Sequence, residues 1–271
     1  MAEPLVLKSE LLTARGVRHG FSTRIGGVSE GPFATLNVAV GPGDRAEAVE
    51  ENLRRFTAAI GVERGGLYQT SQVHGADVRV VEPSDDPAAV LHERADALAA
   101  FPSSRGPSSR GASSGGPSTA AHLAVGVRTA DCVPILVHDQ VTGGVAAIHA
   151  GWRGVVSGVV SAAVAQLAIR ARGSKGLVAA IGPCIGPCCF EIGDEVVGAL
   201  LGSVPDESII LRDRERPHAD LRRAVRLQLG ALGVSEVEDV PGCTRCDAER
   251  FYSHRRDGAR SGRLLAAIAV S

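Results

Sequence analysis

The chain has 271 residues, of which 44% are hydrophobic, so it is long enough to bury one large core or two small ones. Its formal net charge of −1 argues against a general binder of nucleic acid or of membrane surfaces. No uncharged apolar run approaches the roughly eighteen residues needed to cross a bilayer. The first residues also lack the basic and apolar regions of a secretory signal.

The cysteines indicate a reducing environment. They stand at positions 132, 184, 188, 189, 243 and 246, so two of them are adjacent and the first 131 residues contain none. This distribution is a poor disulfide framework for a chain that can build its own core. We therefore expect free thiols and a cytoplasmic location.

The N-terminal region predicts a short strand followed by a helix. Residues 17–23 resemble a strand that leads into a turn at residues 24–27. A helix is expected to begin at Asp44, because Glu47 follows at the spacing of a capping box, and to end at Gly61.

Two further strands are predicted at residues 69–73 and 78–81, on either side of His74. Beyond them, residues 101–119 are almost entirely Ser, Gly, Pro and Arg. Such a segment cannot bury enough apolar area to offset its ordering entropy. We interpret it as a flexible insertion within a loop of a single domain spanning residues 1–271.

The middle of the chain places reactive side chains at the ends of apolar strands. One predicted strand covers residues 123–127 and resumes at residues 133–137, after an interruption at Asp131 and Cys132. Another, at residues 145–148, ends on His149. Side chains at strand ends are held by rigid elements, which suits them for chemistry. A thiol and an imidazole brought together in this way can form a metal site or a nucleophile–base pair.

The remaining pattern predicts a mixed α+β fold. Helices are expected at residues 155–171, 194–201 and 221–232, and strands at residues 177–181 and 264–270. Strands and helices alternate irregularly, which favours mixed sheets in an α+β domain over a doubly wound parallel sheet.

His74, Cys132 and His149 together supply a common zinc donor set with one position left open. Their wide spacing excludes a small zinc-finger module, so the fold would have to assemble the site. Taken singly, each of these residues could equally be an ordinary core or surface side chain.

The other cysteines allow two interpretations. Cys184, Cys188 and Cys189, together with the Cys243-x2-Cys246 pair, could supply a structural four-thiolate zinc site. Neighbouring Pro, Ile and Phe residues instead favour cysteines that pack in the core. The signature of zinc nucleobase deaminases is absent, because the cysteine spacing is one residue too long and His149 is followed by Ala-Gly.

Candidate anion-binding residues are mainly arginines. Arg153 opens a predicted helix, whose free amides favour a phosphate, and Arg24 could assist it. For Arg255 and Arg256 we expect solvated side chains or surface ion pairs. Asn37 could bind substrate or occupy a turn.

Several segments together resemble the laccase-domain proteins, once described as multicopper polyphenol oxidases and now as zinc-containing purine nucleoside phosphorylases. They run in order along almost the whole chain: His19-Gly-Phe-Ser-Thr-Arg-Ile-Gly-Gly-Val-Ser, Leu36-Asn37, Gln72-Val-His-Gly75, Thr129-Ala-Asp-Cys-Val-Pro-Ile-Leu, Ile148-His-Ala-Gly-Trp-Arg-Gly154, Ile181-Gly-Pro-Cys-Ile-Gly-Pro-Cys-Cys-Phe-Glu, Cys243-Thr and Phe251-Tyr-Ser-His-Arg-Arg-Asp-Gly. The segment at residues 101–119 has no place in the family pattern.

The resemblance implies a β-sandwich core flanked by helices, and zinc bound by His74, Cys132 and His149. It implies phosphorolysis of adenosine, inosine and 5′-methylthioadenosine by inorganic phosphate, with adenosine deamination alongside, and it suggests a homodimer. We expect Cys132 and His149 to act in catalysis, with Asp131 orienting a ligand or capping a turn, and Arg153 to hold phosphate together with Arg24. Copper fits poorly, since blue-copper sites use an axial ligand such as Met and Met1 is the only methionine.

Two rival functions remain open at this point. In one, the protein is a metal-free hydrolase or deamidase in which Cys132 attacks and His149 accepts the proton. In the other, it is a zinc-stabilised interaction module without catalytic activity.

Overall fold

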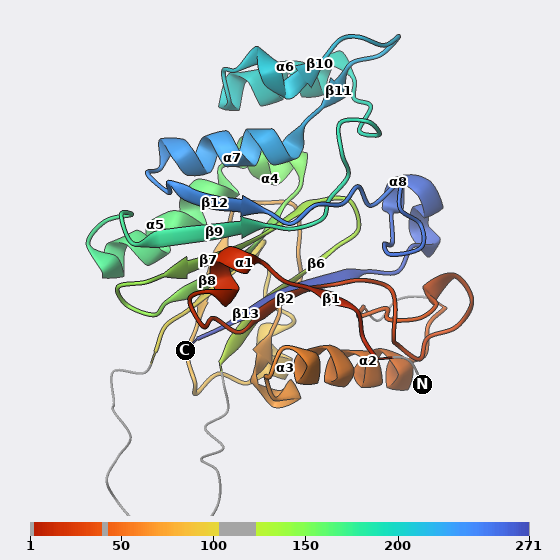
Figure 1. Cartoon of the computed structure of the whole chain (residues 1–271), viewed down its shortest axis with the longest axis vertical. Coiled ribbons are helices and arrows are strands. Elements are labelled where there is room, and N and C mark those ends of the chain that lie inside the picture. Colours follow the sequence, from red (N-terminus) through yellow and green to blue (C-terminus); the bar gives the residue numbers. More distant parts are fainter. Residues whose placement is uncertain (1–2, 40–42, 103–122, 271) are drawn as a thin grey trace, which may run out of the picture.

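Two mixed β-sheets stack face to face, with helices on both outer faces (Figure 1). The computed structural model describes residues 3–39, 43–102 and 123–270. All but the first two residues of the predicted insertion at 101–119 lie outside the described residues.

The first sheet has five strands in the order β1–β2–β13–β6–β3. Their bounds are β1 Val6–Leu7, β2 His19–Ser22, β13 Leu264–Ala269, β6 Ala124–Thr129 and β3 Leu67–Tyr68. Only the pairing of β3 with β6 is parallel among these four neighbouring pairs.

The second sheet has six strands in the order β12–β9–β7–β8–β5–β4. Their bounds are β12 Glu236–Asp239, β9 Leu177–Ile181, β7 Val133–Asp139, β8 Val145–Ala150, β5 Ala97–Ala100 and β4 Val78–Val81. The two outer pairs, β12 with β9 and β4 with β5, are parallel, whereas the three inner pairings are antiparallel. This arrangement confirms the predicted mixed α+β class.

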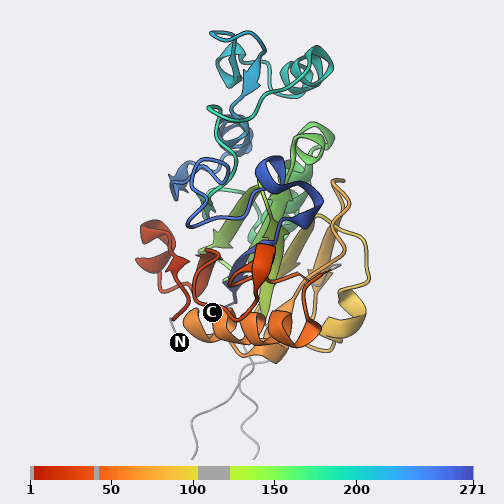
Figure 2. The same ribbon diagram turned by 90° about the vertical axis from the view of Figure 1, so that its right-hand side faces the viewer.

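The helices connect and cover these sheets. The α-helices are α1 Glu10–Thr13, α2 Ala46–Ala59, α3 Pro87–Val90, α4 Trp152–Ser157, α5 Val159–Ala171, α6 Asp194–Ser203, α7 Leu221–Ala231 and α8 His254–Asp257. Short 3-10 turns occupy Gly31–Phe33, Arg64–Gly66, Glu207–Ile209 and Gly258–Arg260. A small hairpin pairs β10 Ile210–Leu211 with β11 His218–Ala219. Figure 2 shows α6 and this hairpin at one end of the molecule, and α2 at the other.

Alternation along the strands builds the sandwich. In β7, Leu136 joins the core between the two sheets, whereas its neighbours Ile135 and Val137 join the core beneath the helices. In β13, Ile268 faces the opposite sheet and Ala267 faces outward. The two-residue period of a strand therefore gives each sheet two apolar faces, and both are buried.

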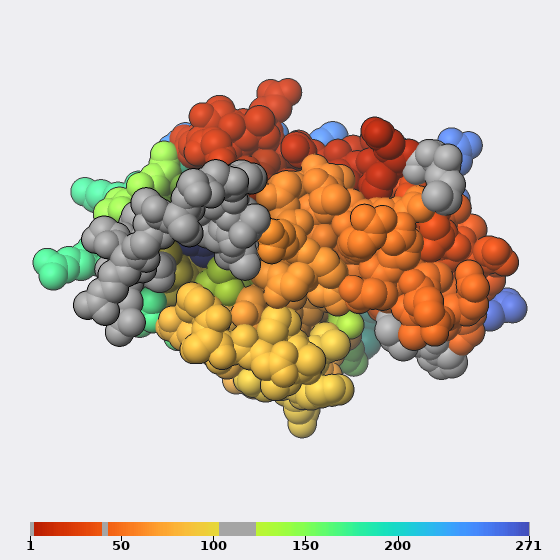
Figure 3. Space-filling model, turned by 90° about the horizontal axis from the view of Figure 1, so that it is seen from below, coloured from red at the N-terminus to blue at the C-terminus, as the bar shows by residue number. Residues whose placement is uncertain are grey.

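Each outer face is covered by an amphipathic helix. On the six-stranded sheet, Val160, Val164 and Leu167 of α5 share one helical face and join the outer core. On the five-stranded sheet, Leu53 and Phe56 of α2 do the same, and α2 forms much of the lower surface (Figure 3). Burying each such side chain contributes about 1.5–3 kcal/mol.

Most expected elements occur close to their predicted positions, but the strand expected at residues 123–137 is wrong. It is two strands, β6 and β7, which belong to different sheets. The chain crosses from one sheet to the other between Thr129 and Val133. The apolar pattern could not reveal this, because both halves are buried strands with the same composition.

Three other boundaries differ from expectation. The helix predicted at residues 155–171 is divided into α4 and α5 at Gly158, whose φ of 86° lies in the left-handed region. The expected strand at residues 69–73 contains only an isolated bridge at Ser71. Helix α2 has Arg45 rather than Asp44 at its N-cap, because the Asp44 carboxylate instead accepts hydrogen bonds from Ser29 and Asn37.

Within the described residues, no helix is both long and apolar enough to cross a membrane.

Candidate metal centre and catalytic cavity

His74, Cys132 and His149 meet at one end of the sandwich, as the sequence predicts. One ligand atom from each residue lies within 4.8 Å of the others, and Cys132 Sγ is 3.9 Å from His74 Nε2. His74 lies in the loop before β4, Cys132 at the crossing between the sheets, and His149 near the end of β8. These three residues form what we call the His–Cys–His centre.

Backbone conformation helps these segments to approach one another. His74 and Asp131 have positive φ angles of 61° and 95°, which cost roughly 1–3 kcal/mol for residues other than glycine. At Gly151, directly after β8, an added Cβ would lie 3.0 Å from Cys132 Sγ and 3.0 Å from His74 Cδ2. Glycine is therefore needed there if both side chains are to reach the centre.

Asp96, directly before β5, holds two parts of the centre in place. Its carboxylate is fully buried and accepts a hydrogen bond from His149 Nδ1 at 2.8 Å. It also accepts the backbone N–H groups of Val73, His74 and Gly75, at 3.1, 2.8 and 2.7 Å. One carboxylate thus orients an imidazole and holds the loop that carries another.

Without a bound metal, the centre favours a thiolate beside an imidazolium. Burial raises the pKa of Cys132, but the charge and hydrogen bonding of His149, with His74, outweigh it and lower the pKa to about 6. Burial likewise lowers the pKa of His149, and the Cys132 charge and the Asp96 hydrogen bond raise it to about 9. The thiolate is the form that binds metals and attacks carbon.

The donor set fits a zinc ion. Tetrahedral zinc with bonds of about 2.0–2.1 Å to nitrogen and 2.3 Å to sulfur places these donors about 3.6 Å apart. The observed 3.9 Å between Cys132 Sγ and His74 Nε2 is close to that value. The hydrogen bond from Nδ1 to Asp96 leaves Nε2 of His149 free to coordinate. Three protein ligands also leave a fourth position for substrate or water.

A cavity of about 510 Å³ opens above the centre, a volume typical of sites for small organic ligands. Its lining includes the apolar side chains of Ile185 and Phe190 and the guanidinium groups of Arg128, Arg255 and Arg263. The guanidinium carbon of Arg255 lies 5.4 Å from the centroid of the Phe190 ring. The remaining lining residues are Ala39, Gln72, His74, Thr129, Ala130, Asp131, Cys132, His149 and His254.

Arg128 and Arg263 make the cavity attractive to an anion. Burial lowers the pKa of both guanidinium groups, and the charge of Arg263 lowers that of Arg128 further. Their side chains donate to main-chain carbonyls, Arg128 to Thr70 and Arg263 to Ser261 and Gly262. No ion pair joins either one to a carboxylate in the part of the chain that is described.

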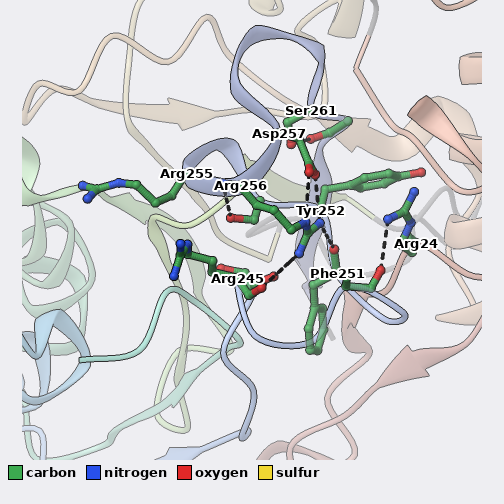
Figure 4. A network of polar contacts seen from close by, with 12 residues as sticks. Arg24, Arg245, Phe251, Tyr252, Arg255, Arg256, Asp257 and Ser261 are labelled. Carbon is green, nitrogen blue, oxygen red and sulfur yellow. Dashed lines mark hydrogen bonds and ion pairs between the residues drawn. The ribbon is translucent and has the colours of Figure 1, made fainter. Parts of the chain in front are cut away.

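Arg255 and Arg256 differ from each other. The exposed Arg255 donates to the carbonyl of Glu191 at 2.9 Å and reaches the cavity, and Figure 4 shows it pointing away from Arg256. Arg256 instead holds the loop around α8. Its guanidinium donates to the main-chain carbonyls of Thr244, Arg245 and Phe251. It also forms an ion pair with the carboxylate of Asp257.

Three of the predicted anion- and substrate-binding residues lie outside the cavity. Arg24 donates to the carbonyls of Ala34 and Ala248 and lies over the Tyr252 ring (Figure 4). Arg153 is exposed and stacks on Trp152, with 4.4 Å from its guanidinium carbon to the ring centroid.

Asn37 also lies outside the cavity and is buried. Its amide donates to the carbonyl of Ala39 and to Asp44, and its oxygen accepts the backbone N–H of Arg263. These contacts correspond to the turn role that the sequence left open for Asn37.

Asp131 lines the cavity but holds no ligand of the His–Cys–His centre. Its carboxylate accepts the Thr244 hydroxyl and the Arg255 backbone N–H, both at 2.6 Å. Its own carbonyl accepts the backbone N–H of Ile185 at 2.9 Å. These contacts fix the turn that presents Cys132, which corresponds to the turn role left open by the sequence.

Sequence reasoning missed Asp96, Arg128 and Arg263. Asp96 is a single carboxylate in the otherwise apolar run from Ala95 to Ala100, and this isolation is the signal that could have identified it. Arg128 lies near the end of β6, close in sequence to Cys132, and Arg263 directly precedes β13. Their positions in the sequence do not distinguish them from an arginine outside the cavity, such as Arg24.

Comparison with known proteins identifies the family of the chain. A family model described as "Multi-copper polyphenol oxidoreductase laccase" matches residues 18–271. A protein from Pseudomonas aeruginosa named purine nucleoside phosphorylase is 38% identical over 255 residues, covering 93% of each chain. Purine nucleoside phosphorylase YlmD from Geobacillus stearothermophilus is 35% identical over 259 residues, covering 93% of this chain and 90% of that protein.

The fold is also similar to a solved structure. The crystal structure of YlmD from Geobacillus stearothermophilus matches with a TM-score of 0.81 and 32% identity, covering 94% of this chain and 92% of that one. Since the family model and these relatives span nearly the whole sequence, the chain belongs to the multi-copper polyphenol oxidoreductase laccase family, whose curated relatives found here are named purine nucleoside phosphorylases.

Proposed function

We propose that this protein is a zinc-dependent purine nucleoside phosphorylase. It would act on adenosine, inosine and 5′-methylthioadenosine, and would deaminate adenosine as a side reaction. The observation that carries the proposal is the His–Cys–His centre in a cavity that is also lined by three arginines and by the apolar side chains of Ile185 and Phe190. The names of the relatives are consistent with it.

Arg128 and Arg263 are assigned to phosphate, with Arg255 at the mouth. They line the cavity and have no carboxylate partner among the described residues, whereas Arg24 and Arg153, favoured from the sequence, lie outside it. Guanidinium groups bind phosphate oxygens in pairs of parallel hydrogen bonds. An anion between two such cations would also relieve their mutual repulsion.

Ile185 and Phe190 are assigned to the purine. Burial of a flat aromatic base against apolar side chains is favourable and leaves its polar edge to be recognised elsewhere. The base would then lie against Phe190, with the ribose between it and the phosphate held by Arg128 and Arg263.

In phosphorolysis, a phosphate oxygen forms a bond to C1′ of the ribose as the bond from C1′ to the purine nitrogen breaks. The electron pair leaves with the base, which takes up a proton, and ribose 1-phosphate remains. The arginines would hold the nucleophile against C1′, which converts a bimolecular encounter into a reaction between positioned groups.

His74, Cys132 and His149 would hold the zinc ion, and Asp96 would fix the tautomer of His149. When bound, zinc supplies a Lewis acid that polarises an oxygen at the open position. For deamination, water would attack C6 of adenosine and ammonia would leave. Copper is the weaker candidate, because the sequence offers no methionine besides Met1 as an axial ligand.

We also propose a cytoplasmic location, since all six cysteines are free. The homodimer suggested by family resemblance remains an expectation, and sedimentation of the purified chain would test it.

The direct test measures hypoxanthine released from inosine with and without phosphate, using zinc-loaded protein, with ribose 1-phosphate as the second product. We expect release to require phosphate and to be lost in the Cys132→Ser and His74→Ala variants. The matched control is Cys184→Ala, which removes a buried thiol outside the cavity. Release that is independent of phosphate would contradict the phosphorylase assignment.

A second candidate is a metal-free cysteine hydrolase or deamidase. It is favoured by a chain of contacts in which the Asp96 carboxylate orients His149, and His149 in turn interacts with the Cys132 thiolate. These are the nucleophile, base and orienting group that such a hydrolase uses. This function needs no second imidazole at the thiol. Activity that survives His74→Ala in metal-free protein, but not Cys132→Ser, would select it over the phosphorylase.

A further inference from the structure

Four cysteines outside the His–Cys–His centre come together on the surface. Two lie in the loop after β9 and two in the loop after β12, and these strands are parallel neighbours. Both loops therefore leave the same edge of the sheet. We call these residues the four-cysteine cluster: Cys188, Cys189, Cys243 and Cys246.

The sulfur positions match those around a single metal ion. Cys188 Sγ lies 3.6 Å from Cys243 Sγ and 3.5 Å from Cys246 Sγ, and Cys189 Sγ is 3.3 Å from Cys246 Sγ. All four lie within 4.8 Å of one another. A tetrahedron of thiolates with zinc–sulfur bonds of about 2.3 Å has edges of about 3.8 Å. A disulfide would need about 2.05 Å, and all four thiols are free.

The earlier interpretation of these residues as packing cysteines is wrong for two of the four. Cys188 and Cys246 are exposed, whereas Cys189 and Cys243 are half-buried. Core packing therefore does not explain why four thiols gather here. Among the cysteines of these two loops, only Cys184 is buried.

The backbone around the cluster is arranged as in thiolate metal sites. The N–H of Gly186 donates to Cys243 Sγ at 3.2 Å, which favours the thiolate form. Main-chain bonds tighten each loop, from Cys189 to Gly186 and from Asp247 to the Cys243 carbonyl. The spacing Cys243-x2-Cys246 places two donors on one such turn.

We propose that the four-cysteine cluster binds one zinc ion as a structural site, separate from the His–Cys–His centre. Four thiolates in a tetrahedron close the coordination shell, so this ion has no open position for substrate. A multi-iron cluster does not fit, because its cysteines bind different irons and stand farther apart than donors to one ion.

The site would brace the wall of the catalytic cavity. Thr244, directly after Cys243, donates to Asp131, and Ile185 of the other loop donates to the carbonyl of the same residue. Asp131 precedes Cys132, and Ile185 and Phe190 line the cavity. An ion that joins the two loops therefore fixes the turn that presents the catalytic thiol.

The test is the zinc content of the full-length protein, purified without chelators and measured by mass spectrometry of the metal. We expect two zinc ions per chain in the wild type and one in either Cys246→Ser or Cys188→Ser. The variant His74→Ala should also contain one, and the double variant His74→Ala/Cys246→Ser none. The control Cys184→Ala should keep both.

A second set of measurements starts from the wild type, whose thiol titration does not depend on how any variant folds. Titration of the native wild type with a mercurial reagent should release the second zinc as the exposed thiols react, and Co²⁺ substitution should give charge-transfer absorption that Cys246→Ser strongly weakens. A wild type with one zinc that Cys246→Ser leaves in place would overturn the proposal. So would iron in place of zinc, or a disulfide among the four thiols. None of these readouts uses nucleoside turnover, so the result is independent of the proposed activity.

Discussion

Replacing Asp96 with Asn tests whether one buried carboxylate organises the His–Cys–His centre. The substitution keeps the size of the side chain but removes its charge and turns one oxygen into an NH2 group. Each carboxylate oxygen accepts two hydrogen bonds, one from His149 Nδ1 and His74 N–H, the other from Val73 and Gly75 N–H. Whichever oxygen becomes the NH2 group, the two N–H groups that donated to it then face another donor and lose their acceptor.

The structure sets the size of the effect. Two hydrogen bonds to a charged acceptor are lost, at about 1.5–3 kcal/mol each, so the free energy of unfolding should fall by about 3–6 kcal/mol. Loss of the partner that orients His149 should also weaken zinc binding at this centre by about 10–100-fold. Stability and metal affinity should therefore fall together.

Urea unfolding of the zinc-loaded protein and competition with a chromophoric chelator measure these two quantities. The matched control is Asp139→Asn, because Asp139 is also a fully buried carboxylate that accepts backbone N–H groups, from Val141 and Thr142, but it ends β7, at the opposite end of that strand from Cys132. The control should lose stability and keep its zinc affinity. Equal zinc affinity in Asp96→Asn and the wild type would refute the role assigned to Asp96.

Three further outcomes are expected. Gly151→Ala should lower the zinc content, because its Cβ would lie 3.0 Å from Cys132 Sγ, whereas Gly202→Ala, with open space around its Cβ, should not; metal analysis of both variants decides. Arg263→Ala should raise the KM for phosphate about 10–100-fold, because a hydrogen bond between charged groups contributes about 1.5–3 kcal/mol, and should leave the KM for inosine nearly unchanged in steady-state assays. Stability should fall as the pH falls below about 6.5, because burial lowers the pKa of His19 and the folded protein resists its protonation.

The environment of His19 explains the sign of that pH dependence. Its Nε2 accepts the backbone N–H of Ser9 and its Nδ1 contacts the Val17 carbonyl, so the folded protein holds the neutral ring. Burial is the largest cause of its lowered pKa and the charge of Lys8 adds to it, while the hydrogen bond to the Val17 carbonyl and the charge of Glu238 act in the opposite direction. The stabilisation is thus complete above the unfolded value near 6.5 and is lost below it. Unfolding by urea at several pH values should show a shallower decline in His19→Gln, and parallel curves would contradict this explanation.

Local patterns predict most strands and helices of this protein but not how they are assembled. The apolar runs at β7, β8 and β9 predict buried strands correctly, because burial on both faces leaves a continuous hydrophobic sequence. The same property hides the change of sheet between β6 and β7. The sequence of a buried apolar strand does not indicate which of the two sheets it joins.

In the candidate site, too, local sequence patterns predict some of the residues but not how they are assembled. Residue types at strand ends made His74, Cys132 and His149 a possible donor set, and the family resemblance implied that all three bind one ion; in the structure their ligand atoms lie together. The residues that position these three side chains, such as Asp96, are not identified by this pattern of residue types at strand ends. Asp96 lies more than twenty residues from the loop it holds, so only the folded chain brings donor and acceptor together.

The crossing between the sheets explains why the centre forms where it does. The chain must reverse at Asp131 to pass from β6 to β7, and it must turn sharply at His74 before β4, and both residues adopt positive φ angles to do so. Each costs roughly 1–3 kcal/mol and is held by hydrogen bonds, to Asp96 at His74 and to Thr244 and Arg255 at Asp131. Two strained turns, each fixed by a carboxylate, therefore present one imidazole and one thiol to the same point. The two carboxylates have different tasks, because only Asp96 touches a ligand imidazole, so its loss should affect metal binding directly, whereas that of Asp131 should act through the backbone.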